Sequence, residues 1–215
     1  MWRSLVVAAL LAGMLAGIAA ARDPWDPHTR IRAADQAKAA ATVLRRDDLG
    51  AGWTGGARTP TSLKAPTCPA QRPNDGDLTL TGHAESIFSN GNGGVQVDSD
   101  VEVFPNSKQA RARFVRFLQP KLATCLRYDL QKSFGGAKVT ILKLQRLKLA
   151  KVADRVAAFR LPLVYQGVAV DSDFLFLGRG RSQLYVNVIA PSSSEGQLPG
   201  FELRVAKLLV KRVPA

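Results

Sequence analysis

Hydrophobic and polar residues alternate along the segment from Val95 to Phe104. The valines of this segment stand at every second position apart from Ser99, and the positions between them carry Gln96, Asp98, Asp100 and Glu102. A period of two is typical of an antiparallel strand with one buried face. The segment from Leu78 to Phe88 is also predicted as a strand, and the Gly/Asn-rich run from Ser89 to Gly94 predicts a hairpin turn between the two.

The second half of the chain contains further strand-like segments. We predict strands at Lys138 to Leu149, Ala158 to Gln166, Val168 to Leu177 and Gln183 to Ile189. The run Gly178-Arg179-Gly180-Arg181 predicts a second hairpin turn, between the last two of these strands.

Three segments carry the periodicity or composition of helices. The first, Ala33 to Arg46, is rich in Ala and lacks Gly and Pro. The second follows Pro105-Asn106-Ser107, which supplies a stop and a helix cap, and Pro120 should kink it. Its apolar face comprises Ala110, Phe114, Phe117, Leu118, Leu122 and Cys125. The third, Phe201 to Val213, closes the chain with Phe201, Val205, Leu208 and Leu209 facing inward.

The segment between the first helix and the first strand reads as irregular. Gly50, Gly52, Gly55 and Gly56 should end the helix around Trp53, and Arg58 to Pro73 carries four prolines, which favours a loop. Together these elements predict an α+β fold, an antiparallel β-sheet with flanking α-helices packed on one side of it.

The first 21 residues have the composition of a secretory signal peptide. Arg3 supplies a positive charge, Leu5 to Ala21 holds no charge, and Ala19-Ala20-Ala21 offers small residues for cleavage. An uncleaved membrane anchor is the alternative, because 17 apolar residues reach the lower limit of a membrane span. We expect a signal peptide at 1–21, a linker at 22–32 and a single domain at 33–213, in a secreted or extracytoplasmic protein.

Two cysteines, Cys68 and Cys125, lie in the part predicted to be exported. An even number of cysteines in an oxidising compartment predicts a disulfide bond. The alternative is two unrelated buried thiols. A zinc site is not expected of them, since no neighbouring histidines complete a tetrahedral ligand set.

The chain has a formal net charge of +13, and the charge is unevenly spread. Asn74 to Phe104 holds six acids and no Lys or Arg, whereas Pro105 to Lys151 holds twelve bases and one acid. A basic field favours anionic partners, which outside the cell are envelope polymers or lipid headgroups at a membrane surface rather than nucleic acid. The residues predicted for such an anion-binding face are Lys108, Arg111, Arg113, Arg116 and Lys121. The alternative is a solvated basic face that keeps the protein soluble.

Candidate chemistry is sparse. The sequence Asp-Ser-Asp occurs at 98–100 and again at 171–173, each time within a repeat of Gly-Val-x-Val-Asp-Ser-Asp. Such carboxylates could hold a hard cation like calcium, but plain alternation, with the acids facing water, explains them without a metal. The glycines of Gly50 to Gly55 spell a dinucleotide-site pattern but follow a helix instead of a strand, so no cofactor is expected.

A catalytic centre is not expected either. A nucleophile pair would have to use His83, because the other histidine, His28, lies in the linker. No Gly-x-Ser-x-Gly or Ser-x-x-Lys motif is present. Glu85 and Asp98 are the carboxylates that a hydrolase would use, and nothing else marks them as catalytic.

Two segments resemble a known family. Val97 to Pro105, leading into a helix that carries Cys125, resembles the extracellular sensor-type domain of actinobacterial PknH-like proteins, and Asp48 to Trp53 resembles small exported proteins of the same kind. The resemblance covers about a third of the chain. It implies an antiparallel sheet with flanking helices and a ligand-binding cleft, and it offers no catalytic residues. The chain differs from the kinase-linked members in having no kinase domain and one cysteine pair where two are common.

We therefore expect a non-catalytic, extracytoplasmic, sensor-like domain that binds a small-molecule, lipid or glycan ligand of the cell envelope. The alternatives are a carboxylate-dependent envelope hydrolase and a structural protein that binds anionic envelope polymers or lipid headgroups.

Overall fold

The computed structural model describes residues 26–60, 68, 74–91, 94–119, 121–133 and 139–213. The predicted signal peptide lies outside the described residues. None of the helices in this part of the chain has the length and apolar character that a membrane span requires.

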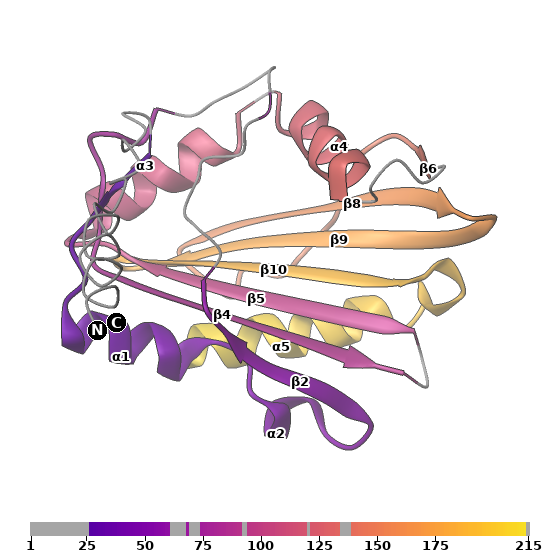
Figure 1. Cartoon of the computed structure of the whole chain (residues 1–215), viewed down its shortest axis with the longest axis horizontal. Coiled ribbons are helices and arrows are strands. Elements are labelled where there is room, and N and C mark those ends of the chain that lie inside the picture. The colour runs from indigo at the N-terminus through magenta and orange to yellow at the C-terminus, as the bar shows by residue number, and fades with distance from the viewer. Residues whose placement is uncertain are drawn as a thin grey trace, which may run out of the picture.

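An antiparallel eight-stranded sheet forms the centre of the molecule (Figure 1). Its strands follow the order β2-β4-β5-β10-β9-β8-β6, and β7 also pairs with β8. The strands are β2 (Trp53–Arg58), β4 (Gly82–Asn90), β5 (Val95–Val103), β6 (Val139–Ile141), β7 (Gln145–Arg146), β8 (Arg155–Tyr165), β9 (Val168–Arg179) and β10 (Ser182–Pro191). The two predicted hairpins are confirmed as β4–β5 and β9–β10, and the predicted α+β class is confirmed with them.

Helices cover both faces of this sheet, whereas the sequence analysis placed them on one side. On one face lie α1 (Ala33–Thr42) and α5 (Leu198–Arg212); on the other lie α3 (Ser107–Phe117) and α4 (Leu122–Ser133) (Figure 1). The reason is visible in β9, where Leu175 and Leu177 pack into the α1/α5 core while Phe174 and Phe176 pack beneath α3 and α4. A strand that is apolar on both faces needs a layer on each.

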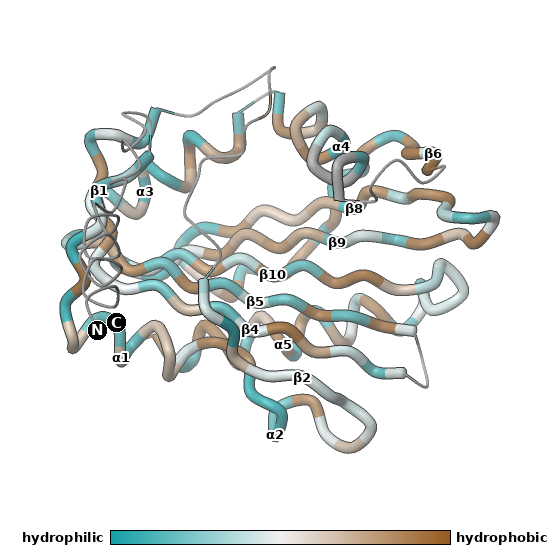
Figure 2. The backbone as a smooth tube through the Cα atoms, viewed as in Figure 1, coloured by the Kyte–Doolittle hydropathy of each residue, from teal (hydrophilic) through white to brown (hydrophobic). Residues whose placement is uncertain are grey.

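The α1/α5 face holds the larger core. Figure 2 shows hydrophobic and hydrophilic positions alternating along β5, as its sequence pattern predicts. Val97, Val101 and Val103 of that strand are at most 1% exposed and pack in this core. The edge of the core is closed by Trp53, whose ring stacks on Phe201 with centroids 5.7 Å apart.

The segment predicted as an irregular helix exit contains an edge strand instead. Residues Trp53–Arg58 form β2, paired antiparallel with β4. Gly55 has φ +127°, and a Cβ atom there would lie 2.1 Å from the carbonyl oxygen of Ile87. The glycines therefore let two backbones approach closely, a role that the sequence pattern did not distinguish from helix termination. The short helix α2 (Arg46–Leu49) precedes this strand.

Three smaller differences concern element boundaries. The strand predicted at Lys138 to Leu149 is two short strands, β6 and β7, separated by irregular backbone. The predicted kinked helix is two helices, because α3 ends at Phe117 and α4 begins at Leu122, with Pro120 outside the described residues. The segment predicted as a linker contains β1 (His28–Thr29), which pairs in parallel with β3 (Thr79–Leu80) in a separate two-stranded sheet. A 3₁₀ turn, η1 (Ser192–Ser194), precedes α5.

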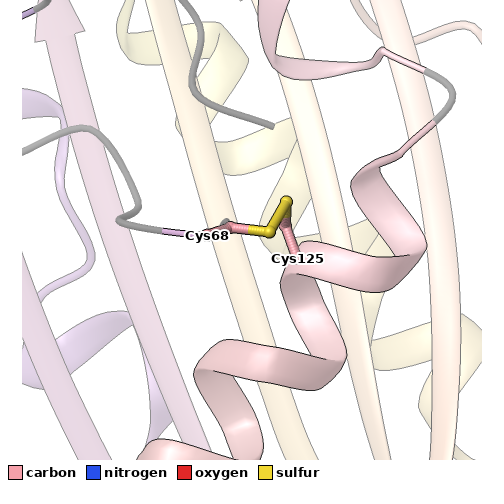
Figure 3. The surroundings of a disulfide bond; sticks show 2 residues. All are labelled: Cys68 and Cys125. Carbon is pink, nitrogen blue, oxygen red and sulfur yellow. A yellow bond between two sulfur atoms is a disulfide. The ribbon is translucent and has the colours of Figure 1, made fainter. Parts of the chain in front are cut away.

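The predicted disulfide bond is confirmed. Cys68 is bonded to Cys125 of α4, with 5.2 Å between their Cα atoms (Figure 3). Both residues are buried, at 3% and 6% exposure. The bond therefore holds the chain at residue 68 against α4, on the face of the sheet that α3 and α4 cover.

Candidate functional site

Six charged or titratable side chains lie on adjacent strands β2, β4 and β5. Glu102 is held by Arg113 of α3, and we call the other five the polar patch: Arg58, His83, Glu85, Asp98 and Asp100. Strand register brings them together, because Arg58 pairs with Glu85 across β2 and β4, and Glu85 pairs with Asp100 across β4 and β5.

The polar patch faces the α3/α4 side of the sheet. Alternation along β5 sends Val97 and Val101 into the α1/α5 core and sends Asp98 and Asp100 to the opposite face. Across β5 and β10, Asp100 stands directly opposite Tyr185, which packs against the cluster beneath α3 and α4. One half of this sheet face is therefore apolar and covered by helices, and the other half is polar.

The side chains of the polar patch contact one another. Nε2 of His83 lies 3.1 Å from Oδ2 of Asp100 and 3.5 Å from Oε1 of Glu85. Arg58 donates from Nε to the other carboxylate oxygen of Glu85, at 2.6 Å. These contacts form one chain of charged groups across three strands.

Asp98 lies beside this chain, near enough for the charges of Arg58 and Glu85 to affect it. Its Oδ2 accepts a hydrogen bond from the Gln96 side chain at 3.3 Å. Its Oδ1 is buried, and the described part of the chain offers that atom no hydrogen-bond partner. A buried acceptor without a partner costs about 1–3 kcal/mol, so it calls for a ligand or a functional reason.

The polar patch has a buried floor and an open rim. The side chains of His83 and Glu85 are 6% and 5% exposed, whereas those of Asp100 and Arg58 are 29% and 41% exposed. Solvent and small solutes can therefore reach the patch at Asp100.

Helix α1 positions the start of β4, where His83 stands. Strand β2 pairs with β4 only from Glu85 onward, so the backbone of His83 needs another partner. Gln36 supplies it, donating from Nε2 to the His83 carbonyl at 2.7 Å and accepting from the His83 amide at 3.1 Å. A Cβ atom at Gly82 would lie 2.3 Å from the Asp35 carbonyl oxygen, so glycine permits this close approach of helix and strand.

Burial shifts the protonation of the acids in the polar patch. Desolvation raises the pKa of Asp100 to about 6, with the hydrogen bond from His83 opposing that rise. Desolvation also raises the pKa of Asp98, although Gln96 and Arg58 act against it. For His83, burial disfavours the charged ring, but Asp100, Glu102 and Glu85 outweigh it and raise the pKa. His83 and Asp100 therefore each favour the charged form of the other.

The residues predicted as an anion-binding face do not form one surface. Arg113 is 7% exposed and lies in ion pairs with Asp75 and Glu102. Arg116 pairs with Asp77. The other three, Lys108, Arg111 and Lys121, are exposed. The apolar stripe of α3 is narrow, so Arg113 of the same helix also lies against the sheet. There it meets Glu102 of β5 and Asp75, which precedes β3.

The two Asp-Ser-Asp runs face opposite sides of the sheet. Register through β10 aligns Asp98 with Phe174, which stands 76 residues further along the chain. The sequence repeat instead relates residues that are 73 positions apart. The difference is odd, so equivalent acids point to different faces. Asp173 receives two hydrogen bonds from Arg160, at 2.8 and 2.7 Å, in a buried ion pair on the α5 side. Only the first run contributes to the polar patch.

Two surface pockets lie elsewhere. These pockets, of about 620 and 460 Å³, flank the segment that precedes β8, and Lys151 and Asp154 line both. These two charged side chains are exposed, so they bring no desolvated polar group to a ligand. The polar patch is the stronger candidate because two of its titratable groups, His83 and Glu85, are buried.

The sequence analysis named Glu85 and Asp98 as carboxylates for a hydrolase and His83 as the histidine for a nucleophile pair, but it did not group them. Asp100 was considered only as part of the Asp-Ser-Asp run, and Arg58 was not singled out. The signal was present in the hairpin, since His-x-Glu on one strand faces Asp-x-Asp on the next once the turn sets the register. The sequence did not indicate which face of the sheet carries the second apolar core, beneath α3 and α4.

No protein-family model and no curated protein matches the sequence. Among solved structures, the chain is similar to the extracellular domain of PknH from Mycobacterium tuberculosis, with a TM-score of 0.45 and 12% identity over 82% of this chain and 96% of that one. It is also similar to a protein of unknown function from Pseudomonas aeruginosa described as a putative regulator, with a TM-score of 0.32 and 13% identity over 63% and 85% of the two chains. Similarities at this level establish neither family nor function, so the function is argued below from the side chains.

Proposed function

We propose that this protein is a non-catalytic, sensor-like domain that works outside the cytoplasm and binds its ligand at the polar patch. The observation that carries the proposal is the set of desolvated charged groups on a sheet face whose other half is ordinary apolar core. Ionised side chains are expensive to bury, and perturbed protonation concentrates at functional sites. A purely structural face would be expected to continue the apolar core of α3 and α4.

The charges of the patch select the ligand. Glu85, Asp98 and Asp100 outnumber Arg58 and His83, and Asp98 keeps an acceptor oxygen without a partner in the described part of the chain. A ligand with a cationic or hydrogen-bond-donating group would satisfy that acceptor. The expected partner is therefore not the anionic polymer that the net charge suggests.

The disulfide supports a location outside the cytoplasm. Stable disulfide bonds persist in oxidising compartments and are rare where thiols are kept reduced. Cys68–Cys125 is such a bond, and the apolar segment from Leu5 to Ala21 has the composition of an export signal.

A binding role fits the contacts better than hydrolysis does. The Nε2 atom of His83, which would activate a serine, faces Asp100 and Glu85 instead. Glu85 is held by Arg58 in a hydrogen-bonded ion pair. The structural-protein alternative is weakened because Arg113 and Arg116 are engaged with acids of the same chain.

Mass spectrometry of native protein tests the proposal. The protein is purified from its own host, and co-purifying small molecules, lipids and glycans are compared for the wild type, for Asp98→Asn with Asp100→Asn, and for the exposed control Asp47→Asn. We expect an adduct on the wild type and the control that the double variant loses. An adduct retained by the double variant would place the ligand elsewhere.

The same preparations separate the alternatives. Turnover of envelope material that disappears in Asp98→Asn would establish the hydrolase. Binding to anionic vesicles that weakens steeply with added salt, and is lost when Lys108, Arg111 and Lys121 are replaced by Gln, would establish the basic surface, because screening acts on exposed charges.

A further inference from the structure

We propose that His83, Glu85 and Asp100 bind a divalent transition-metal ion, and that Zn²⁺ is the ion their donor atoms suit best. The inference rests on the proposed function, since it names the metal ion as a ligand of the polar patch.

The geometry fits one ion. One ring nitrogen and two carboxylate oxygens, one from each residue, all lie within 4.8 Å of one another. Metal–ligand bonds of about 2.1 Å at angles of 90–120° place neighbouring donor atoms about 3.0–3.6 Å apart. The distances from Nε2 of His83 to the carboxylate oxygens of Asp100 and Glu85 are 3.1 and 3.5 Å, inside that interval.

The donor types favour zinc over calcium. Calcium takes six to eight oxygen ligands, and the polar patch offers one imidazole and few carboxylates. One histidine with two carboxylates leaves a fourth position of a tetrahedral zinc site for water or a second ligand. Zinc also binds nitrogen and oxygen donors more tightly than manganese does.

The surroundings support the three ligands. Arg58 holds Oε2 of Glu85 at 2.6 Å, which orients the carboxylate with Oε1 toward His83. Gln36 holds the backbone of His83 from both sides. Such outer contacts orient metal ligands and contribute to affinity.

Two further observations point to a ligand here. The Oδ1 atom of Asp98 is a buried acceptor that lacks a hydrogen-bond partner in the described part of the chain, and it lies two residues along β5 from Asp100 on the same face. The rim at Asp100 is open to solvent, so an ion can enter.

The test uses the full chain, freed of metal by a chelator and titrated with ZnCl₂ in a calorimeter. We expect one Zn²⁺ per chain, bound at least about 10-fold more weakly in His83→Gln and in Asp100→Asn, since loss of a ligand costs no less than loss of an outer contact. The matched controls are His28→Gln and Asp47→Asn, which should bind as the wild type does.

Histidine NMR of the unaltered protein keeps the test decisive if the variants fail to fold. The sequence has two histidines, so the ring signals are few. One equivalent of Zn²⁺ should shift the signals of His83 and leave those of His28 in place.

Either of two results would overturn the inference. The first is an absence of heat and of any shift at His83. The second is binding that persists unchanged in both ligand variants. The proposed function would survive each of these if an organic adduct is still lost with Asp98→Asn and Asp100→Asn, so the two proposals can fail separately.

Discussion

At the scale of single residues, several arginines are held in ion pairs with acids of the same chain. Six arginines form ion pairs within the described part of the chain: Arg58, Arg113, Arg116, Arg160, Arg181 and Arg212. Arg113 is the most consequential of them, because it lies between two acids that are themselves buried, Asp75 and Glu102. Desolvation raises the pKa of Asp75, and the charge and hydrogen bond of Arg113 oppose that rise.

Replacing Arg113 should destabilise the fold far more than replacing its neighbour Arg111. Arg113→Ala leaves Glu102 buried without its cation and Asp75 with only the 3.5 Å contact to Arg116. Removing one partner of a buried ion pair typically costs about 3–5 kcal/mol. Arg111→Ala changes an exposed side chain and should stay within about 0.5 kcal/mol. Urea unfolding of both variants measures the difference, and equal losses would show that Arg113 is not the buried anchor described here.

At the scale of elements, α5 is docked on the sheet through a buried acid. Glu202 of this helix is 3% exposed. Its pKa is raised to about 9, first by desolvation and then by the hydrogen bond and charge of Asp173 on β9. The helix therefore packs best when Glu202 carries a proton.

The stability of the protein should therefore fall as the pH rises from about 4.5 to about 9. Over that range the folded state keeps a proton on Glu202 that the unfolded chain releases, so raising the pH favours unfolding. Glu202→Gln removes this contribution, and its unfolding free energy should decline less between pH 6 and pH 9 than that of the wild type. Urea unfolding at both values measures this, with Asp47→Asn as the exposed control. A decline identical in Glu202→Gln and the wild type would contradict the assignment.

At the scale of the whole molecule, the disulfide joins parts of the chain that lie 57 residues apart. The closed loop includes the hairpin β4–β5 and helix α3, so the bond restricts the unfolded chain over much of its first half. On the chain-entropy model a loop of this length is worth about 4 kcal/mol.

Removing the bond should lower the free energy of unfolding by about that amount. The double variant Cys68→Ser with Cys125→Ser is compared with the wild type by urea unfolding without reductant. Alkylation of the native wild type followed by mass spectrometry should label neither cysteine. Labelled thiols, or a double variant as stable as the wild type, would contradict this account.

Much of the fold could be predicted from the sequence because its signals are local. Two of these signals span only a few residues: the alternation from Val95 to Val103 and the cap at Asn106. A third, the even number of cysteines, is a simple count. The structure confirms the strand, the cap and the disulfide bond that they predict. The amide of Gln109, for example, donates to the Asn106 side chain at 3.0 Å. Export, the actinobacterial origin and the ligand class stay predictions.

The tertiary structure alone decided how faces and partners combine. Whether Asp98 or Asp173 points to the polar patch depends on register across three strands, and a shift of one residue would exchange the faces. Whether Arg113 meets water or Glu102 depends on where α3 lies over the sheet. The polar patch depends in part on strand order. The hairpin pattern places His83 beside the strand of Asp100, but no local pattern specifies that β2, which carries Arg58, pairs with β4. Periodicity states that a strand has a buried face, and only packing determines what is buried against it.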